Sequence, residues 1–194
     1  WAKIIGIYKM KHPLRKSALV LLAFFTIAVK AQRTAIYVDA DALYKTGLDL
    51  FDKNQYASAQ KNFIEYATLS KSSLLKADAT YYSAACGIEL FNKDSEWLMR
   101  QFIEKNPSST KINNAYFYLG KSNYRKKKYQ ETLEFFEKVD TYKLDKEQLS
   151  EFRFKRGYSY LQKGEDTKAK ADFFEIKDID NKYAFPANYY YSHL

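Results

Sequence analysis

The chain has 194 residues, of which 46% are hydrophobic and 28% charged, and this composition excludes a disordered chain. A single Cys excludes an intrachain disulfide and a cysteine-rich zinc site, and two His leave little material for histidine-based catalysis or metal binding. The net charge is +9, but six of the 32 basic residues lie within 1–31, which contain no acidic residue. Residues 32–194 contain the other 26 basic residues and all 23 acidic ones, so their net charge is only +3. Nucleic-acid binding is therefore not expected.

The first segment has the three regions of a secretory signal peptide. Residues 1–9 are interpreted as upstream read-through, because the chain does not begin with Met. Within 10–31, a basic start precedes an apolar run, Ala18–Val29, which is too short to span a bilayer. A small-residue site then predicts cleavage between Ala31 and Gln32 and an exported protein; the alternative is a buried or amphipathic first helix.

A six-residue pattern recurs five times in the rest of the chain, at spacings of 37, 36, 37 and 35 residues. Self-similarity at such a period is the signature of a repeat architecture. Each copy has an aromatic residue at its third place and a small residue at its sixth. The aromatic residues are Tyr44, Tyr81, Phe117, Phe154 and Tyr189, and the small residues are Gly47, Ala84, Gly120, Gly157 and Ser192.

A second pattern follows the first, 12 and 16 residues after the small residue. It places a small residue and an aromatic residue on one helical face in three units: Ala59 with Phe63, Thr132 with Phe136, and Ala169 with Phe173. The second unit departs from this pattern, because Glu96 and Arg100 occupy the two places. There we predict a rotated helix, or one shifted by a residue, whose apolar face is supplied by Trp97, Leu98 and Phe102.

The two patterns are separated by short polar turns, and the chain is rich in helix-forming residues with no alternating strand pattern. Each unit is therefore predicted to be a helix–turn–helix hairpin in which the small residue lets the two helices approach closely. The predicted units cover residues 40–73, 76–108, 112–140 and 148–180, with a partial unit over 184–194. The array is expected to continue beyond residue 194, because the last segment is aromatic where a terminal repeat would be polar.

The units resemble tetratricopeptide repeats, on the pattern of Gly47, Ala59 and Phe63 and of Gly157, Tyr160, Ala169 and Phe173. This resemblance covers residues 40–194 and implies an all-α fold, a right-handed α-solenoid whose first helices line a concave face. It also implies a non-catalytic scaffold with a protein or peptide partner, without cofactor, metal or nucleic acid. The leader and the divergent units resemble exported repeat proteins of Gram-negative bacteria, which implies a periplasmic or envelope-associated location.

The resemblance implies that the aromatic residues at the third place face the groove and contact a partner. The alternative is that they pack between successive first helices. It also implies polar groove residues, acidic in the early units and basic in the third; the alternative is an ordinary solvated helix face. These residues are Asp41, Asp52, Asp78, Glu89, Asn114, Lys121, Tyr124, Arg125, Glu151 and Gln162. Chaperone-binding members carry a basic–Asn pair where this chain has Tyr44 and Leu48, so capture of an acidic C-terminus is not expected.

Three further features have more than one interpretation. The basic run Arg125–Lys128 could contact phosphate or an anionic membrane, or could simply be a solubilising turn. Cys86 is expected to be a small buried hydrophobic residue rather than a nucleophile. The functional alternatives to a scaffold are a substrate-positioning arm of a larger envelope enzyme or assembly factor and, with less support, an RNA-binding helical repeat.

Overall fold

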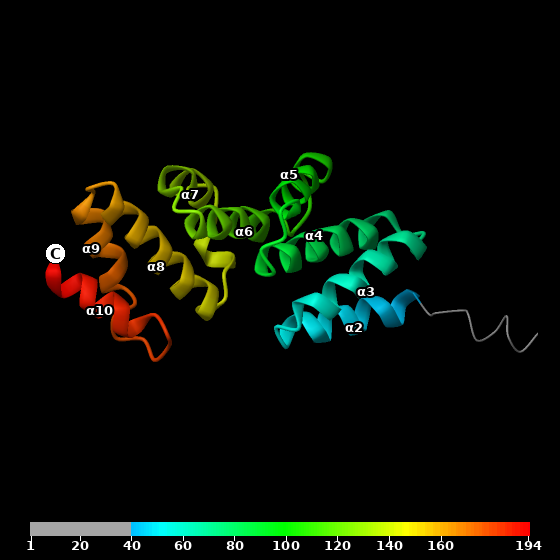
Figure 1. The fold of residues 1–194 in the computed structure, drawn as a ribbon, viewed down its shortest axis with the longest axis horizontal. Helices are drawn as coiled ribbons and strands as arrows, with labels where there is room; N and C mark the ends of the chain where they lie inside the picture. The colour runs from blue at the N-terminus through cyan, green and yellow to red at the C-terminus, as the bar shows by residue number, and fades with distance from the viewer. Residues whose placement is uncertain (1–39) are drawn as a thin grey trace, which may run out of the picture. The chain divides into compact units, whose positions relative to one another are not determined.

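The computed structural model describes residues 40–194, and within that range every regular element is helical (Figure 1). This confirms the expected all-α class for the described residues. The expected signal peptide over 10–31 and its cleavage point lie outside them. The elements are α2 (Ala40–Asp52), α3 (Tyr56–Leu69), α4 (Ser73–Glu89), α5 (Ser95–Lys105), α6 (Ile112–Arg125), α7 (Tyr129–Phe136), the short 3-10 helix η1 (Thr141–Lys143), α8 (Lys146–Gln162), α9 (Asp166–Phe174) and α10 (Ala184–His193).

Each helix packs against the helix that follows it in the chain, and the first helices of neighbouring units, α4 with α6 and α6 with α8, also touch (Figure 1).

The start of α8 is fixed by a capping box in the local sequence. The Asp145 carboxylate accepts a hydrogen bond from the Gln148 backbone N–H at 2.8 Å, and the Gln148 side chain returns to the Asp145 N–H. Within residues 40–194, no helix has the length and apolar character needed to cross a membrane.

Three hairpins close on a contact between a glycine and an aromatic ring. A Cβ added to Gly47 would lie 2.9 Å from the Phe63 ring, and one added to Gly157 would lie 3.1 Å from the Phe173 ring. The contact is tightest at Gly120, where the Cβ would lie 2.3 Å from a ring carbon of Phe136. Real Cβ atoms do not come as close as at Gly47 and Gly120, so these two positions need glycine for the ring to pack there, and at Gly157 a side chain would force its neighbours to shift. This geometry matches the close approach that the repeat pattern predicts.

The second helix of the second unit is shifted by one residue from the predicted positions of Glu96 and Arg100. Ser95 and Met99 occupy the buried places instead, at 1% and 0% exposure. The prediction that Trp97 lies on the apolar face was wrong, because its side chain is 61% exposed. Ser95, Met99 and Phe102 share one face of α5, and a residue two places after Ser95 points to the other side of the helix.

The turn of every hairpin contains one residue in the left-handed backbone region. These residues are Asn54, Phe91, Lys127 and Gly164, with φ of 58°, 60°, 59° and 74°. Each lies seven positions after the small residue at the sixth place of the repeat pattern. The left-handed region costs about 1–2 kcal/mol for a residue with a Cβ. Three of the four turns therefore carry a backbone strain that glycine would relieve.

We expect Lys127→Gly to stabilise the fold by about 1 kcal/mol, because glycine adopts the left-handed backbone without strain. The Lys127 side chain is exposed, so its removal should cost little. Gly164→Ala is the matched opposite change and should destabilise by about the same amount. A Cβ at Gly164 would meet no atom within 4 Å, so this variant reports backbone strain alone. Urea unfolding followed by circular dichroism measures both changes. A loss of stability in Lys127→Gly would contradict the prediction.

Candidate ligand groove on the first helices

The aromatic residues at the third repeat place lie mainly in the core. Tyr81 and Phe117 are 2% and 1% exposed, and the Phe117 ring stacks on Phe136 at a centroid distance of 6.2 Å. Tyr44 and Phe154 are half-buried against the neighbouring helices. Tyr189 is 54% exposed. The burial of Tyr81 and Phe117 supports the packing interpretation for these two residues.

A cavity of about 360 Å³ opens on the side of the first helices, and we call it the groove. Its walls come from α2, α4, α6 and α8, from the first turn of α3 and from the segments that precede α8 and α10. The lining residues are Phe51, Asp52, Asn54, Tyr56, Glu89, Phe117, Tyr118, Lys121, Asp145, Glu147, Gln148, Glu151 and Lys182. Five residues that the repeat resemblance assigned to a groove therefore meet here: Asp52, Glu89, Phe117, Lys121 and Glu151.

Charged residues from three successive first helices form a connected row beside this cavity. The Lys121 ammonium lies 2.6 Å from Oε1 of Glu89 on α4 and 3.1 Å from Oε1 of Glu151 on α8. Glu89 also pairs with Arg125 at 3.3 Å, and Glu151 with Lys155 at 2.9 Å. All five side chains are between 10% and 19% exposed. We call Arg125, Glu89, Lys121, Glu151 and Lys155 the charge ladder, and its charges are largely compensated within the fold.

The lysines of the charge ladder keep Glu151 ionised. Burial alone would raise the pKa of Glu151, but Lys155 and Lys121 outweigh it and hold that pKa below its usual range. Because this pKa is lower in the folded chain, ionised Glu151 stabilises the fold at neutral pH. That contribution is lost as the pH falls through the folded pKa. Burial, and next the charge of Glu89, raise the pKa of Tyr56 to about 12, so this hydroxyl stays protonated.

The rim of the groove is acidic and accessible. Asp52 is exposed and makes no ion pair with any residue of the described range. Asp145 is exposed and caps α8. Glu147 bonds to Lys182 at 2.9 Å, and the two side chains are 71% and 64% exposed. The rim therefore carries three carboxylates and one ammonium group, so its net charge is negative.

The other residues that the resemblance assigned to the groove do not line this cavity. Asn114 is hydrogen-bonded to Tyr81. Tyr124 packs edge-to-face with Tyr129 and Tyr158 at centroid distances of 6.2 and 5.8 Å. Gln162 is exposed at the end of α8, and Arg125 is paired with Glu89 in the charge ladder.

The repeat pattern missed two charged features. Asp145, Glu147 and Lys182 lie outside the repeated six-residue pattern, although Glu147 precedes Glu151 by one helical turn. The second feature is an ion pair that joins α9 to α8. Asp172 on α9 is only 2% exposed and accepts hydrogen bonds from Arg156 on α8 at 2.8 and 2.6 Å. Its neighbour Phe173 lies about 100° away around the helix, so the sequence offered no signal of this burial.

Cys86 is fully buried, and burial raises the pKa of its thiol to about 12, so the thiolate that a nucleophile needs is not formed at neutral pH. Among residues 40–194, no cluster of His, Cys, Asp and Glu side chains is arranged to hold a metal ion.

Comparison with models of known protein families and with curated proteins finds no match to this chain. The resemblance to tetratricopeptide repeats therefore depends on the recurring sequence pattern alone.

Proposed function

We propose that this chain is a non-catalytic, exported scaffold of the tetratricopeptide type, a right-handed solenoid whose groove binds a protein or peptide segment. One observation carries the proposal: a single cavity of about 360 Å³ receives side chains from the first helices of four successive hairpins. A surface assembled from several repeats suits an extended ligand, because each repeat adds contacts along its length. The exported location is supported by the leader pattern over 10–31.

The electrostatics of the groove favour a ligand with cationic side chains. The charge ladder already neutralises Lys121 and Arg125, so these cations are not available to an acidic partner. The exposed carboxylates of Asp52 and Glu147 remain at the rim. Complementary charge steers encounter and fixes the register of a bound segment. We therefore expect a ligand that presents Lys or Arg to this rim.

The test is site-specific crosslinking in the cells that make the protein. A photo-activated amino acid replaces Asp52 at the rim, and in a matched control it replaces Lys61, which is exposed on α3 and does not line the groove. We expect one defined crosslinked product from position 52 and none from position 61. The added change Glu147→Lys should weaken the crosslink by about tenfold, since it reverses a rim charge. Equal labelling from both positions would contradict the proposal.

A further inference from the structure

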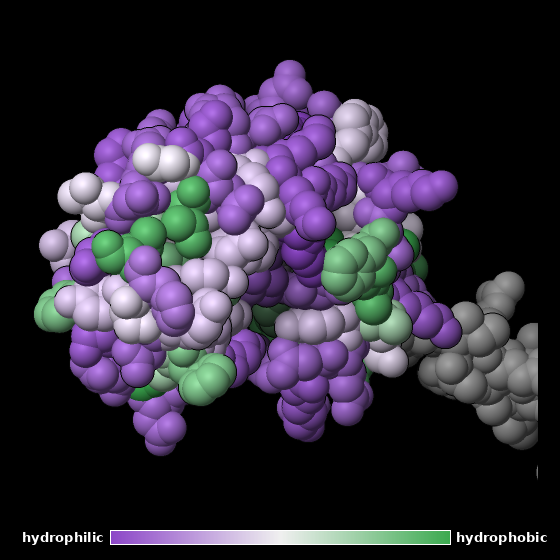
Figure 2. Space-filling model, turned by 60° about the vertical axis from the view of Figure 1, so that its left-hand side comes forward, coloured by the Kyte–Doolittle hydropathy of each residue, from purple (hydrophilic) through white to green (hydrophobic). Residues whose placement is uncertain are grey.

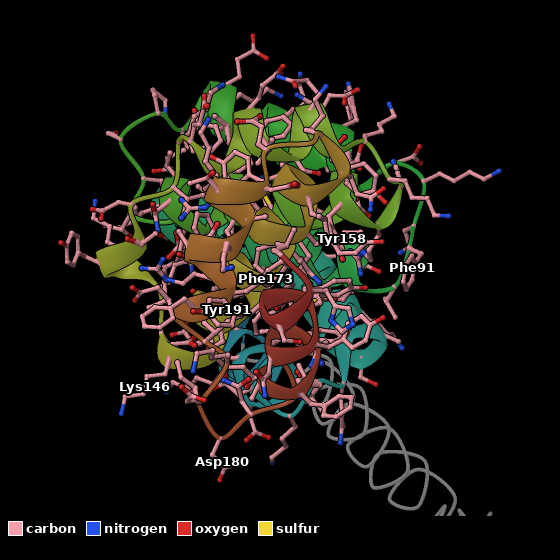
Figure 3. All side chains as sticks on the ribbon, turned by 90° about the vertical axis from the view of Figure 1, so that its left-hand side faces the viewer. Phe91, Lys146, Tyr158, Phe173, Asp180 and Tyr191 are labelled. Atoms are coloured by element: carbon pink, nitrogen blue, oxygen red, sulfur yellow. The ribbon has the colours of Figure 1, made fainter. Side chains whose placement is uncertain are left out.

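Phe91 has an unusual position in the turn between α4 and α5. Its backbone φ is 60°, and its side chain is 73% exposed. The equivalent turn residues are Asn54, Lys127 and Gly164, so within residues 40–194 this is the one hairpin turn that places a bulky apolar residue in the left-handed region. Figure 3 shows Phe91 at the edge of the molecule, whereas Phe173 lies among the helices. Both the strain and the exposure are unfavourable for folding, and such costs are typical of residues that bind a ligand or a partner.

The ring is held in place by a cation from the next hairpin. The guanidinium carbon of Arg125 lies 4.4 Å from the centroid of the Phe91 ring. Arg125 is itself fixed, because it donates to the Ile88 carbonyl at 2.5 Å and pairs with Glu89 at 3.3 Å. One face of the ring is therefore covered by a held guanidinium group, and the side chain remains largely open to solvent.

A small cavity of about 270 Å³ lies beside the ring, between the turns of the second and third hairpins. Its lining includes Ile88, Phe91, Glu96 and Arg125, together with Lys93 and Lys126. This volume is just below the range of about 300–1,000 Å³ for small-molecule sites, so it suits one apolar side chain better than a large molecule. Figure 2 shows one mostly hydrophilic face, with apolar side chains gathered in separate patches.

The surroundings of this cavity are basic. Glu96, the carboxylate in its lining, is already engaged by Ser122 at 2.5 Å and by Lys126 at 2.9 Å. Lys93, Lys127 and Lys128 are exposed and form no ion pair within residues 40–194, while Asp94 is the exposed carboxylate beside Lys93. The cations outnumber the free carboxylates, in contrast to the acidic rim of the groove.

We propose that Phe91 and this cavity form a second docking site, which binds an acidic segment of another protein through an apolar side chain. The apolar side chain enters the cavity and packs against the Phe91 ring, and flanking carboxylates approach Lys93 and Lys127. The energy of such a site is concentrated in the aromatic anchor, with the charges adding selectivity. Because the groove rim has the opposite charge, the two surfaces would bind different segments.

The experiment measures fluorescence anisotropy of a labelled synthetic peptide with the full chain. The probe has acidic residues on both sides of a central tryptophan, and a second probe replaces the tryptophan by alanine. We expect saturable binding of the tryptophan probe and binding at least about tenfold weaker for the alanine probe. Phe91→Gly should lower the affinity for the tryptophan probe by about tenfold, although it relieves the backbone strain.

The matched control is Asn54→Gly, which places glycine at the equivalent left-handed position of the first hairpin and should leave the affinity within about twofold of the parent chain. Thermal unfolding separates loss of binding from loss of fold, since Phe91→Gly should melt no lower than the parent. Lys93→Glu is a second, independent variant at an exposed side chain. It should lower the affinity for the tryptophan probe by about fivefold.

Three outcomes overturn the proposal. They are no saturable binding of the tryptophan probe, equal binding of the two probes, and equal affinity of Phe91→Gly and the parent chain. A fourth outcome assigns the surface to a membrane instead: Phe91-dependent binding to vesicles of phosphatidylcholine and phosphatidylserine without binding of the peptide.

Discussion

Lys121→Glu is expected to destabilise the fold by about 3–5 kcal/mol, because it places a third carboxylate between Glu89 and Glu151. The parent ammonium is only 15% exposed and lies 2.6 and 3.1 Å from the two carboxylates, so water cannot screen the new repulsion well. Lys121→Met should cost less, about 1–2 kcal/mol, because Glu89 keeps Arg125 and Glu151 keeps Lys155. Urea unfolding followed by circular dichroism gives the three free energies.

The control for this prediction is Lys53→Glu, the same charge reversal at an exposed ion pair. Lys53 lies 2.7 Å from Asp49, and both side chains are about 60% exposed. Exposed pairs contribute little, so this variant should cost less than about 1 kcal/mol. If Lys121→Glu costs no more than Lys53→Glu, the charge ladder does not contribute to the stability of the fold.

This expected result changes how the groove can be tested. Lys121 and Arg125 would be natural targets for charge reversal if they were free groove cations. In the structure, they hold successive first helices together, so their reversal would reduce binding by damaging the scaffold. Asp52 and Glu147 avoid this problem, because both are exposed and neither belongs to the charge ladder. Substitutions at these two positions report on the ligand more directly.

The sequence predicts hairpin geometry well where the contact is local. Gly120 and Phe136 are 16 residues apart, and a helix–turn–helix of this length leaves few ways to place them other than face to face. The repeat pattern does not fix the register of α5, because this helix carries no matching small–aromatic pair. The one-residue shift to Ser95 and Met99 becomes evident only when the burial of each residue is known.

The charge ladder could not be predicted in the same way, because its partners come from different repeats. Lys121 is 32 residues from Glu89 and 30 from Glu151, separations at which sequence gives no pairing rule. The resemblance identified all three as groove residues, but it did not indicate that they neutralise one another. The rim residues Asp145 and Lys182 were missed because connecting segments lie outside the repeated pattern.

Gly120→Leu should destabilise the fold by about 3 kcal/mol, because the close approach of α6 and α7 leaves no room for a side chain. Even the first added atom, Cβ, would lie 2.3 and 2.4 Å from two carbons of the Phe136 ring. That ring is 1% exposed and is confined by Phe117 and by Phe152, at a centroid distance of 4.7 Å, so it cannot move aside freely. Gly47→Leu, where the Cβ distance is 2.9 Å, should cost less.

A double-mutant cycle shows whether the Phe136 ring is the obstacle. Gly120→Ala should cost about 1–2 kcal/mol, since overpacking outweighs the gain of about 1 kcal/mol in helix propensity. Phe136→Leu removes the ring and should itself cost about 1–2 kcal/mol through the cavity it leaves. In the double variant, the added methyl group can occupy part of that cavity, so we expect its cost to be smaller than the sum of the two single costs. Additive costs would mean that another neighbour, not the Phe136 ring, sets the spacing of the hairpin.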